Sequence, residues 1–259
     1  MTQTLKRLVF LTDEHYPYTV SAVHDIKFPK KETALLKFLK DFDPHYVVQG
    51  GDALDLEVIA HWNKSRPRIT EGKRLKPVYD EYNGILDQRA KACKSLEKHI
   101  MLQGNHEAWI EALLDEQPAF EGMVEVQSNL NLKSRGIQWV EQRKHAKIGH
   151  LYFIHGDYKR GYTAAYAAKA IAGIYGKNVL FGHFHANQVF SAATPFDSQP
   201  YQVTGVGCLC NLNPIWRRNE SSAWTNAFWA GYLLPNGDYH GHTINIINNQ
   251  FVYDGQLYS

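Results

Sequence analysis

A short apolar run followed by glycines and acids, Tyr46-Val47-Val48-Gln49-Gly50-Gly51-Asp52-Ala53-Leu54-Asp55, indicates how this chain folds. The apolar residues predict a buried β-strand, and the glycines allow a sharp turn that leaves space beside Asp52. Open α/β sheets bind their ligands at the carboxyl ends of the strands, which is where this aspartate would lie. A carboxylate has two oxygens, so Asp52 can hold two cations if other ligands lie close to it.

The residues before this strand predict an α/β crossover. Leu5 to Leu11 is another apolar run, and Thr33 to Phe42 has apolar residues at the spacing of an amphipathic helix. A strand, a helix and a strand in this order favour two parallel strands in one sheet. Alternate residues of an extended chain point the same way, so Asp13 and His15 can face one site while Glu14 faces elsewhere.

Strand, glycine turn and helix recur along the chain. Alternating apolar residues and turn residues after Asn187 predict antiparallel strands that complete a second sheet. The segments 137–142 and 151–154 predict a hairpin around residues 143–149. The other predicted elements are helices over 54–62, 78–98, 108–114 and 162–175 and strands over 99–103 and 178–181.

Length and composition are those of one globular domain. The 259 residues are 44% apolar and 21% charged, and no repeat or linker divides them, so we expect a single domain over residues 1–259. A formal net charge of +2 gives no overall basic excess for nucleic acid. The three cysteines, an apolar start too short for a signal peptide and the lack of a run of membrane length favour a cytoplasmic location.

Five predicted strand ends carry oxygen or imidazole groups that can bind a metal. Parallel pairing would bring these ends to one edge, so we expect the groups to converge. Imidazole with carboxylate and amide oxygen suits Mn, Fe, Zn or Ni, and the lack of a thiolate in the set argues against a structural zinc site. The residues are Asp13 and His15, Asp52, Asn105 and His106, His155, and His183 and His185.

The order of these motifs resembles the calcineurin-like metallophosphoesterase superfamily. The matching motifs are Asp13-x-His15, Gly51-Asp52-x-x-Asp55, Gly104-Asn105-His106-Glu107, His155 and Gly182-His183-x-His185. The resemblance covers Asp13 to His185 and only loosely the tail. It implies an α/β fold of mixed α+β type, a four-layer αββα sandwich of two mixed β-sheets flanked by helices, with the part from about residue 187 completing the second sheet.

The resemblance also implies how a two-metal site would be built. One cation would bind to Asp13, His15, Asp52 and His185, and the other to Asp52, Asn105, His155 and His183, with Asp52 bridging. His106 would be the catalytic acid that protonates the leaving oxygen or steadies the transition state, and Asp55 would orient its ring. Two divalent ions, Mn first with Fe, Zn, Ni or Mg as alternatives, would supply a bridging hydroxide for direct attack on phosphorus.

Differences from individual branches of the superfamily narrow the substrate. Leu56 stands where Ser/Thr protein phosphatases have arginine, and Asp55 stands where purple acid phosphatases have tyrosine. Large periplasmic nucleotidases have a further domain, and lipid-precursor pyrophosphatases usually have arginine in place of His106. The motif set is most similar to that of repair nucleases and small phosphodiesterases.

Two segments favour a nucleic-acid substrate. The segment from Lys64 to Lys76 has six cationic residues and one acid, and it is either a solvated loop or a contact for a phosphate backbone. The run from Trp216 to Tyr232 combines aromatic residues with arginines that either stack on bases or pack in the second sheet. The candidate substrate-binding residues are Arg66, Arg68, Lys73 and Arg74; in the second run the residues are Trp216, Trp224, Phe228 and Trp229 with Arg217 and Arg218.

We therefore expect a dinuclear-metal phosphoesterase that hydrolyses a phosphodiester. DNA or RNA is the first substrate class, so the enzyme would be a nuclease. We expect no membrane partner. A small-molecule or nucleotide phosphodiesterase or phosphomonoesterase is the alternative. A Ser/Thr-type protein phosphatase and a non-catalytic metal-binding scaffold remain further alternatives.

Several neighbouring residues keep a structural interpretation. Asn105 is a helix cap by default and can also be a ligand. Glu107 is assigned to the start of a helix, where a carboxylate is favourable. Asp157 is either a partner of the site or a turn residue. Cys208 and Cys210 share one face of a strand and are assigned as buried thiols.

Overall fold

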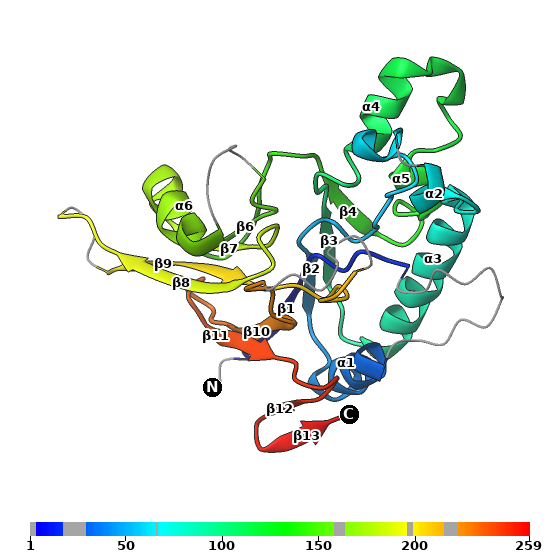
Figure 1. Ribbon diagram of the computed structural model, residues 1–259. Helices are drawn as coiled ribbons and strands as arrows, with labels where there is room; N and C mark the ends of the chain where they lie inside the picture. Colours follow the sequence, from blue (N-terminus) through cyan, green and yellow to red (C-terminus); the bar gives the residue numbers. More distant parts are fainter. Residues whose placement is uncertain (1–3, 18–29, 66, 158–163, 196–198, 215–221) are drawn as a thin grey trace.

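Two β-sheets face each other in the structure, and helices lie on their outer sides (Figure 1). The computed structural model describes residues 4–17, 30–65, 67–157, 164–195, 199–214 and 222–259. The two mixed sheets and their flanking helices confirm the expected α/β sandwich class.

The larger sheet contains β1 (Lys6–Leu11), β2 (Tyr46–Gln49), β3 (Lys98–Leu102), β4 (Ile137–Val140), β10 (Ala227–Leu233) and β11 (Tyr239–Asn245). Its six strands have the order β11-β10-β1-β2-β3-β4. β1 to β4 are parallel, whereas β10 is antiparallel to both β1 and β11. The ends of β1, β2 and β3 therefore lie side by side.

The smaller sheet contains β5 (Ala146–Ile148), β6 (Leu151–Ile154), β7 (Asn178–Phe181), β8 (Asn187–Ala192) and β9 (Tyr201–Val206). Its five strands have the order β5-β6-β7-β9-β8, and β6, β7 and β9 are parallel. A separate hairpin near the carboxyl terminus consists of β12 (Phe251–Tyr253) and β13 (Gln256–Tyr258).

The helices are α1 (Lys30–Phe42), α2 (Pro67–Thr70), α3 (Leu75–Ala92), α4 (Trp109–Glu116), α5 (Val126–Asn129) and α6 (Ala167–Tyr175), with short 3-10 turns η1 (His61–Asn63), η2 (Pro118–Phe120) and η3 (Ala164–Tyr166). Gly176 ends α6 in the left-handed conformation that the sequence predicts for a cap. None of the described helices is long and apolar enough to cross a membrane.

Alternation along β1 divides its side chains between two cores. Leu8 and Phe10 lie in the core between the sheets, where the ring of Phe10 is 5.7 Å from that of Phe153 in β6. Val9 and Leu11 point the other way and belong to the core that includes α1. A further cluster joins α6 to the outer face of the smaller sheet. The packing thus explains the two-sided burial of the central strands.

Three predicted elements differ from the structure in kind, and the predicted helix over 78–98 ends earlier, because α3 stops at Ala92. The segments 137–142 and 151–154 do not form a hairpin, because β4 pairs with β3 while β6 pairs with β5 in the other sheet. The tail divides as well, since β8 and β9 join the smaller sheet but β10 and β11 extend the larger one. Short apolar runs predict strands without specifying their partners. The predicted helix over 54–62 is a turn followed by η1.

A buried arginine connects the end of β1 to two helices. Arg89 of α3 donates to both oxygens of Glu14, at 3.1 and 2.6 Å, and to both oxygens of Glu32 in α1, at 3.0 and 2.8 Å. The three side chains are at most 4% exposed. As the alternation predicts, Glu14 faces these helices while its neighbours Asp13 and His15 contact His185. The ion pairs therefore hold the segment that carries both neighbours.

Replacing Arg89 should strongly destabilise the fold. Arg89→Met would leave two carboxylates buried without their cation, and we expect a loss of about 3–5 kcal/mol in the free energy of unfolding. Lys76→Met is the matched control, because its partner Asp80 is exposed and lies in the same helix; it should cost less than about 0.5 kcal/mol. Urea unfolding measures both values, and equal losses would contradict the assigned role of Arg89.

A half-buried histidine should make the free energy of unfolding depend on pH. Burial and the charges of Arg89 and Arg135 lower the pKa of His99 to about 3. Its imidazole lies 2.9 Å from Oε1 of Gln49. Below pH of about 6.5 the unfolded chain binds a proton at His99 while the folded protein does not, so stability falls with falling pH through this window.

The variant His99→Gln keeps an N–H donor but does not titrate. Relative to this variant, the wild type should lose about 1.6 kcal/mol of unfolding free energy between pH 6.5 and 5. Urea unfolding at both pH values measures the difference. If the wild type and His99→Gln lost the same unfolding free energy between the two pH values, His99 would take up its proton in the folded protein as it does in the unfolded chain.

Candidate metal centre

The candidate ligands come from five strand ends that belong to both sheets. β1, β2 and β3 of the larger sheet and β6 and β7 of the smaller one each end next to predicted ligands. The sequence predicted convergence at one edge of a parallel sheet, and the structure instead brings together the ends of two facing sheets. The segments after β1 and β2 are joined by backbone bonds from Asp13 to Gly51 and from His15 to Asp52.

The first group of candidate ligand atoms comes from Asp13, His15 and His185. Nε2 of His185 lies 3.1 Å from Oδ1 of Asp13 and 3.2 Å from Nε2 of His15. The Asp13 carboxylate is buried, and it accepts the backbone N–H of His183 at 2.8 Å. Nε2 of His15 lies 3.9 Å from Oδ2 of Asp52. These are the four side chains assigned to the first cation.

The second group of candidate ligand atoms comes from Asp52, Asn105, His155 and His183. Oδ2 of Asp52 lies 3.3 Å from Nε2 of His155, and that nitrogen lies 3.0 Å from Oδ1 of Asn105. Nδ1 of His155 donates to the carbonyl of Gly50 at 2.9 Å, which leaves Nε2 as the ligand atom. The rings of His155 and His183 are 5.1 Å apart. The atoms of Asp52, His155 and His183 lie within 4.8 Å of one another.

Both donor sets fit divalent cations. Carboxylate oxygens, imidazole nitrogens and one amide oxygen converge in the two groups, which is the mixture that transition metals accept. Asp52 contributes to both. Two of the imidazole nitrogens face each other across 3.2 Å, an arrangement that a cation between lone pairs would stabilise.

Electrostatics favour ionised aspartates beside protonated histidines. Burial opposes ionisation, but the surrounding histidines hold the pKa of Asp52 well below its ordinary value. Burial likewise opposes protonation of the histidines, yet the carboxylates raise the pKa of His15 to about 9 and that of His155 to about 10. The site therefore retains positive charge beside its carboxylates, charge that bound cations would replace.

Five of the candidate ligands have left-handed backbone conformations. The φ angles of Asp13, His15, Asp52, His183 and His185 lie between 49° and 66°. Such angles are uncommon for residues other than glycine and store strain, which accumulates at functional sites. The turns that follow the strands thus use strained backbone to aim side chains at one another.

Two motif glycines make room for the ligand carboxylates. A Cβ on Gly104 would lie 2.2 Å from Oδ1 of Asp52, and a Cβ on Gly182 would lie 2.2 Å from Oδ2 of Asp13. Neither position can accept a larger residue without displacing the carboxylate. The glycines that precede the motif residues are therefore part of the site.

Glu107 positions Asp52 from behind. Its fully buried carboxylate accepts the backbone N–H groups of Asp52 at 3.0 Å, Leu54 at 3.1 Å and Gly104 at 2.9 Å. Burial and the nearby charge of Asp52 raise the pKa of Glu107 to about 7. The sequence assigned this residue to a helix start, but α4 begins at Trp109 and Glu107 instead joins the ends of β2 and β3.

His106 lies beside Asp52, and its ring is fixed on two sides. Nδ1 donates to the carbonyl oxygen of Asp55 at 2.5 Å, and the Asp55 carboxylate lies 3.5 Å from Nδ1 of both His106 and His15. The ring of Trp109 lies 3.9 Å from that of His106. Nε2 of His106 remains directed to the site, 3.9 Å from Oδ2 of Asp52. Asp55 thus holds the imidazole through its backbone as well as its side chain.

The predicted substrate residues are only partly near the site. Arg66 lies outside the described residues, while Arg68 and Arg74 are exposed. Lys73 contacts Glu57 and interacts electrostatically with Asp55, so it lies at the rim. Two other cations of the segment, Lys64 and Lys76, form ion pairs with Glu116 and Asp80.

The aromatic residues of the run from Trp216 to Tyr232 also lie in different places. Trp216, Arg217 and Arg218 lie outside the described residues. Phe228 and Trp229 are buried in the cores, which supports the packing interpretation for both. The ring of Trp224 is 4.2 Å from that of His185 and lies beside the candidate site.

Sequence reasoning missed three contributors besides Glu107. Trp109 contacts the ring of His106, and Cys208 and Cys210 lie directly behind His185. The spacing of Trp109 from His106 offered a signal, because residues three apart lie on one face of a helix. The others become neighbours only in the folded chain.

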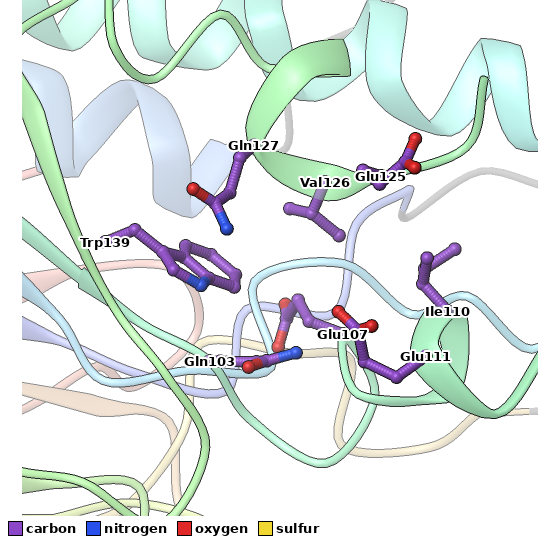
Figure 2. Close-up of a pocket in the computed structure, with 8 residues that line it drawn as sticks. All are labelled: Gln103, Glu107, Ile110, Glu111, Glu125, Val126, Gln127 and Trp139. Atoms are coloured by element: carbon purple, nitrogen blue, oxygen red, sulfur yellow. The ribbon is translucent and has the colours of Figure 1, made fainter. Parts of the chain in front are cut away.

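A small cavity adjoins the site on the side of α4 and α5 (Figure 2). Its volume is about 40 Å³, which is sufficient for water, and none of the candidate ligands lines it. Figure 2 shows its residues: Gln103, Glu107, Ile110, Glu111, Glu125, Val126, Gln127 and Trp139. Glu107 is the only one of them that contacts the backbone of Asp52.

Adding one methyl group at Gly104 should weaken metal binding. Gly104→Ala would push the Asp52 carboxylate out of place, and we expect Mn²⁺ affinity to fall about 10–100-fold, as for other changes that misorient a ligand. The control is Gly84→Ala in α3, where a Cβ would meet no atom within 4 Å. Isothermal titration measures both; unchanged affinity in Gly104→Ala would contradict the tight packing at Asp52.

Comparison with known proteins gives little beyond this geometry. No protein-family model matches the chain, and no curated protein is significantly similar to it. Among solved structures, the protein TT1561 of Thermus thermophilus aligns with 92% of this chain and 99% of its own, at 10% sequence identity and a TM-score of 0.37. Neither value is high enough for a functional comparison.

Proposed function

We propose that this protein is a metal-dependent phosphodiesterase. One divalent cation, with Mn²⁺ the first to test, would bind to Asp13, His15, Asp52 and His185, and a second to Asp52, Asn105, His155 and His183. The observation that supports this proposal is the convergence of both donor groups on Asp52. The sequence motifs, which resemble those of calcineurin-like metallophosphoesterases, support the same assignment.

Two cations at this position would supply an activated water and neutralise the phosphoryl oxygens. The chain itself must provide a proton for the departing oxygen. His106 is suited to this role, because its Nδ1 is occupied by Asp55 while Nε2 faces the site. Asp55 and Trp109 fix the plane of the ring.

Substrate binding would also set the protonation of His106. Burial lowers the pKa of this imidazole to about 4 in the free site. A phosphodiester anion beside Nε2 would favour the imidazolium and raise the pKa towards the range in which a histidine donates its proton. The substrate anion would therefore favour the protonated form of His106, which is the form that can donate a proton.

Nucleic acid is the first substrate class to test. Lys73 at the rim offers a cation for a neighbouring phosphate, and Trp224 beside His185 offers a ring on which a base can stack. The ion pairs of Lys64, Lys73 and Lys76, with Glu116, Glu57 and Asp80, weaken the case for a broad basic surface. A small nucleotide phosphodiesterase is the alternative, and a metal-binding scaffold without turnover is the second.

The role of His106 can be tested with two leaving groups. A dinucleotide releases a basic alkoxide that needs a proton, whereas a bis-nitrophenyl phosphate releases a stable phenolate. With Mn²⁺, His106→Ala should lower kcat about 10²–10⁴-fold on the dinucleotide and much less on the aryl ester. His242→Ala, an exposed histidine stacked on Tyr253, is the control.

Two results would contradict this assignment. Equal losses on both substrates together with weaker Mn²⁺ binding would make His106 a ligand instead of an acid. No turnover of either substrate with any divalent ion would support the scaffold. Gel assays with single- and double-stranded DNA and RNA would then separate a nuclease from an enzyme that cleaves only small nucleotides.

A further inference from the structure

The side of His185 that faces away from the candidate metal centre meets two thiols. Nε2 of His185 lies 3.1 Å from Asp13, whereas Nδ1 lies 3.8 Å from Sγ of Cys210. Sγ of Cys210 is 3.4 Å from Sγ of Cys208. Both thiols are buried, with exposures of 4% and 0%, so the group lies inside the protein.

We propose that Cys208, Cys210 and Nδ1 of His185 bind a soft, thiophilic cation such as Zn²⁺, Cd²⁺ or Cu⁺. Thiolate sulfur and imidazole nitrogen are the donors that such ions prefer over the harder ions suited to oxygen. This assignment goes beyond the proposed phosphodiesterase activity. It places a third cation site directly behind the first two.

The distances fit such an ion. With metal–sulfur bonds of about 2.3 Å and metal–nitrogen bonds of about 2.0 Å, a tetrahedral site separates its sulfurs by about 3.8 Å and sulfur from nitrogen by about 3.6 Å. The observed separations are 3.4 and 3.8 Å. All three donor atoms lie within 4.8 Å of one another. Small rotations of the thiols suffice to bind an ion.

Hydrogen bonds hold the thiol segment in place. The N–H of Leu209, between the two cysteines, donates to the carbonyls of Thr12 and Asp13, each at 3.1 Å. The side chain of Asn226 donates to the carbonyls of Cys208 and Cys210, at 3.3 and 2.8 Å. A preorganised pair of ligands loses little conformational freedom when it binds an ion.

A buried lysine lies next to the thiol segment. Lys31 is 7% exposed, and its Nζ donates to the carbonyl of Cys210 at 2.7 Å. Its positive charge attracts anionic sulfur at both cysteine positions. On binding, each thiol gives its proton to solvent and the two thiolates balance the charge of a divalent ion.

Sharing of His185 couples this site to the candidate metal centre. An imidazole binds one metal at Nε2 while keeping a proton on Nδ1, so a cation on Nδ1 must displace that proton. We therefore expect the thiophilic cation and Mn²⁺ to weaken each other's binding by the same factor. This coupling rests on the proposed metal centre, whereas binding to the thiols does not.

Binding of a thiophilic cation can be tested by titrating the full chain with Cd²⁺ in a buffer that contains a phosphine reductant. The wild type should develop thiolate-to-metal absorbance that saturates at one Cd²⁺ per chain. The band should be lost in Cys208→Ser and in Cys210→Ser, and it should persist in Cys93→Ser, which changes a buried thiol elsewhere. X-ray absorption on the wild type should give two sulfur neighbours and a nitrogen. Absence of the band, or its persistence in the double serine variant, would overturn the proposal.

A second titration separates this site from the proposed function. Cd²⁺ affinity should be lower in protein loaded with Mn²⁺ than in metal-free protein. Equal affinities in the two forms would overturn the sharing of His185. A cadmium band in a protein that binds no Mn²⁺ would support the thiol site while refuting the phosphodiesterase.

Discussion

The carboxylate of Asp52 is the point on which the candidate site depends. It is buried, and its two oxygens lie against the N–H of His106 and the ring of His155. A buried charge is stable only where its neighbours fix and neutralise it, so the surrounding turns must keep one geometry. Glu107 fixes the backbone of Asp52, and Gly104 leaves room for its side chain. The arrangement of the strand ends thus depends on the buried carboxylate of Asp52.

Stability elsewhere in the fold offsets the strain at this point. Left-handed backbone at five candidate ligands is unfavourable and persists only where the surroundings hold it. Glu14 supplies part of that support, because it lies between Asp13 and His15 and is bound to Arg89 on the opposite side. The core between the sheets supplies the rest by fixing β1 against β6. Folding and site geometry therefore depend on the same segment.

The sequence predicted local features well and their partners poorly. Strands β6 and β7 have the predicted bounds, because each is an apolar run bordered by turn residues. All seven predicted metal ligands lie in the groups around Asp52, since each follows a strand. The pairing of β4 with β3 and the roles of Glu107, Cys208 and Cys210 depend on contacts between distant segments. No local pattern specifies such contacts.

The number of cations bound by the folded protein tests the central claim most directly. Elemental analysis and anomalous scattering from crystals grown with Mn²⁺ should both give two ions per chain, one on each side of Asp52. Asp52→Asn should lose both ions, whereas Asp80→Asn, which changes an exposed carboxylate of α3 paired with Lys76, should keep them. A wild-type protein that binds no Mn²⁺, or an Asp52→Asn variant that still binds two ions, would contradict the account.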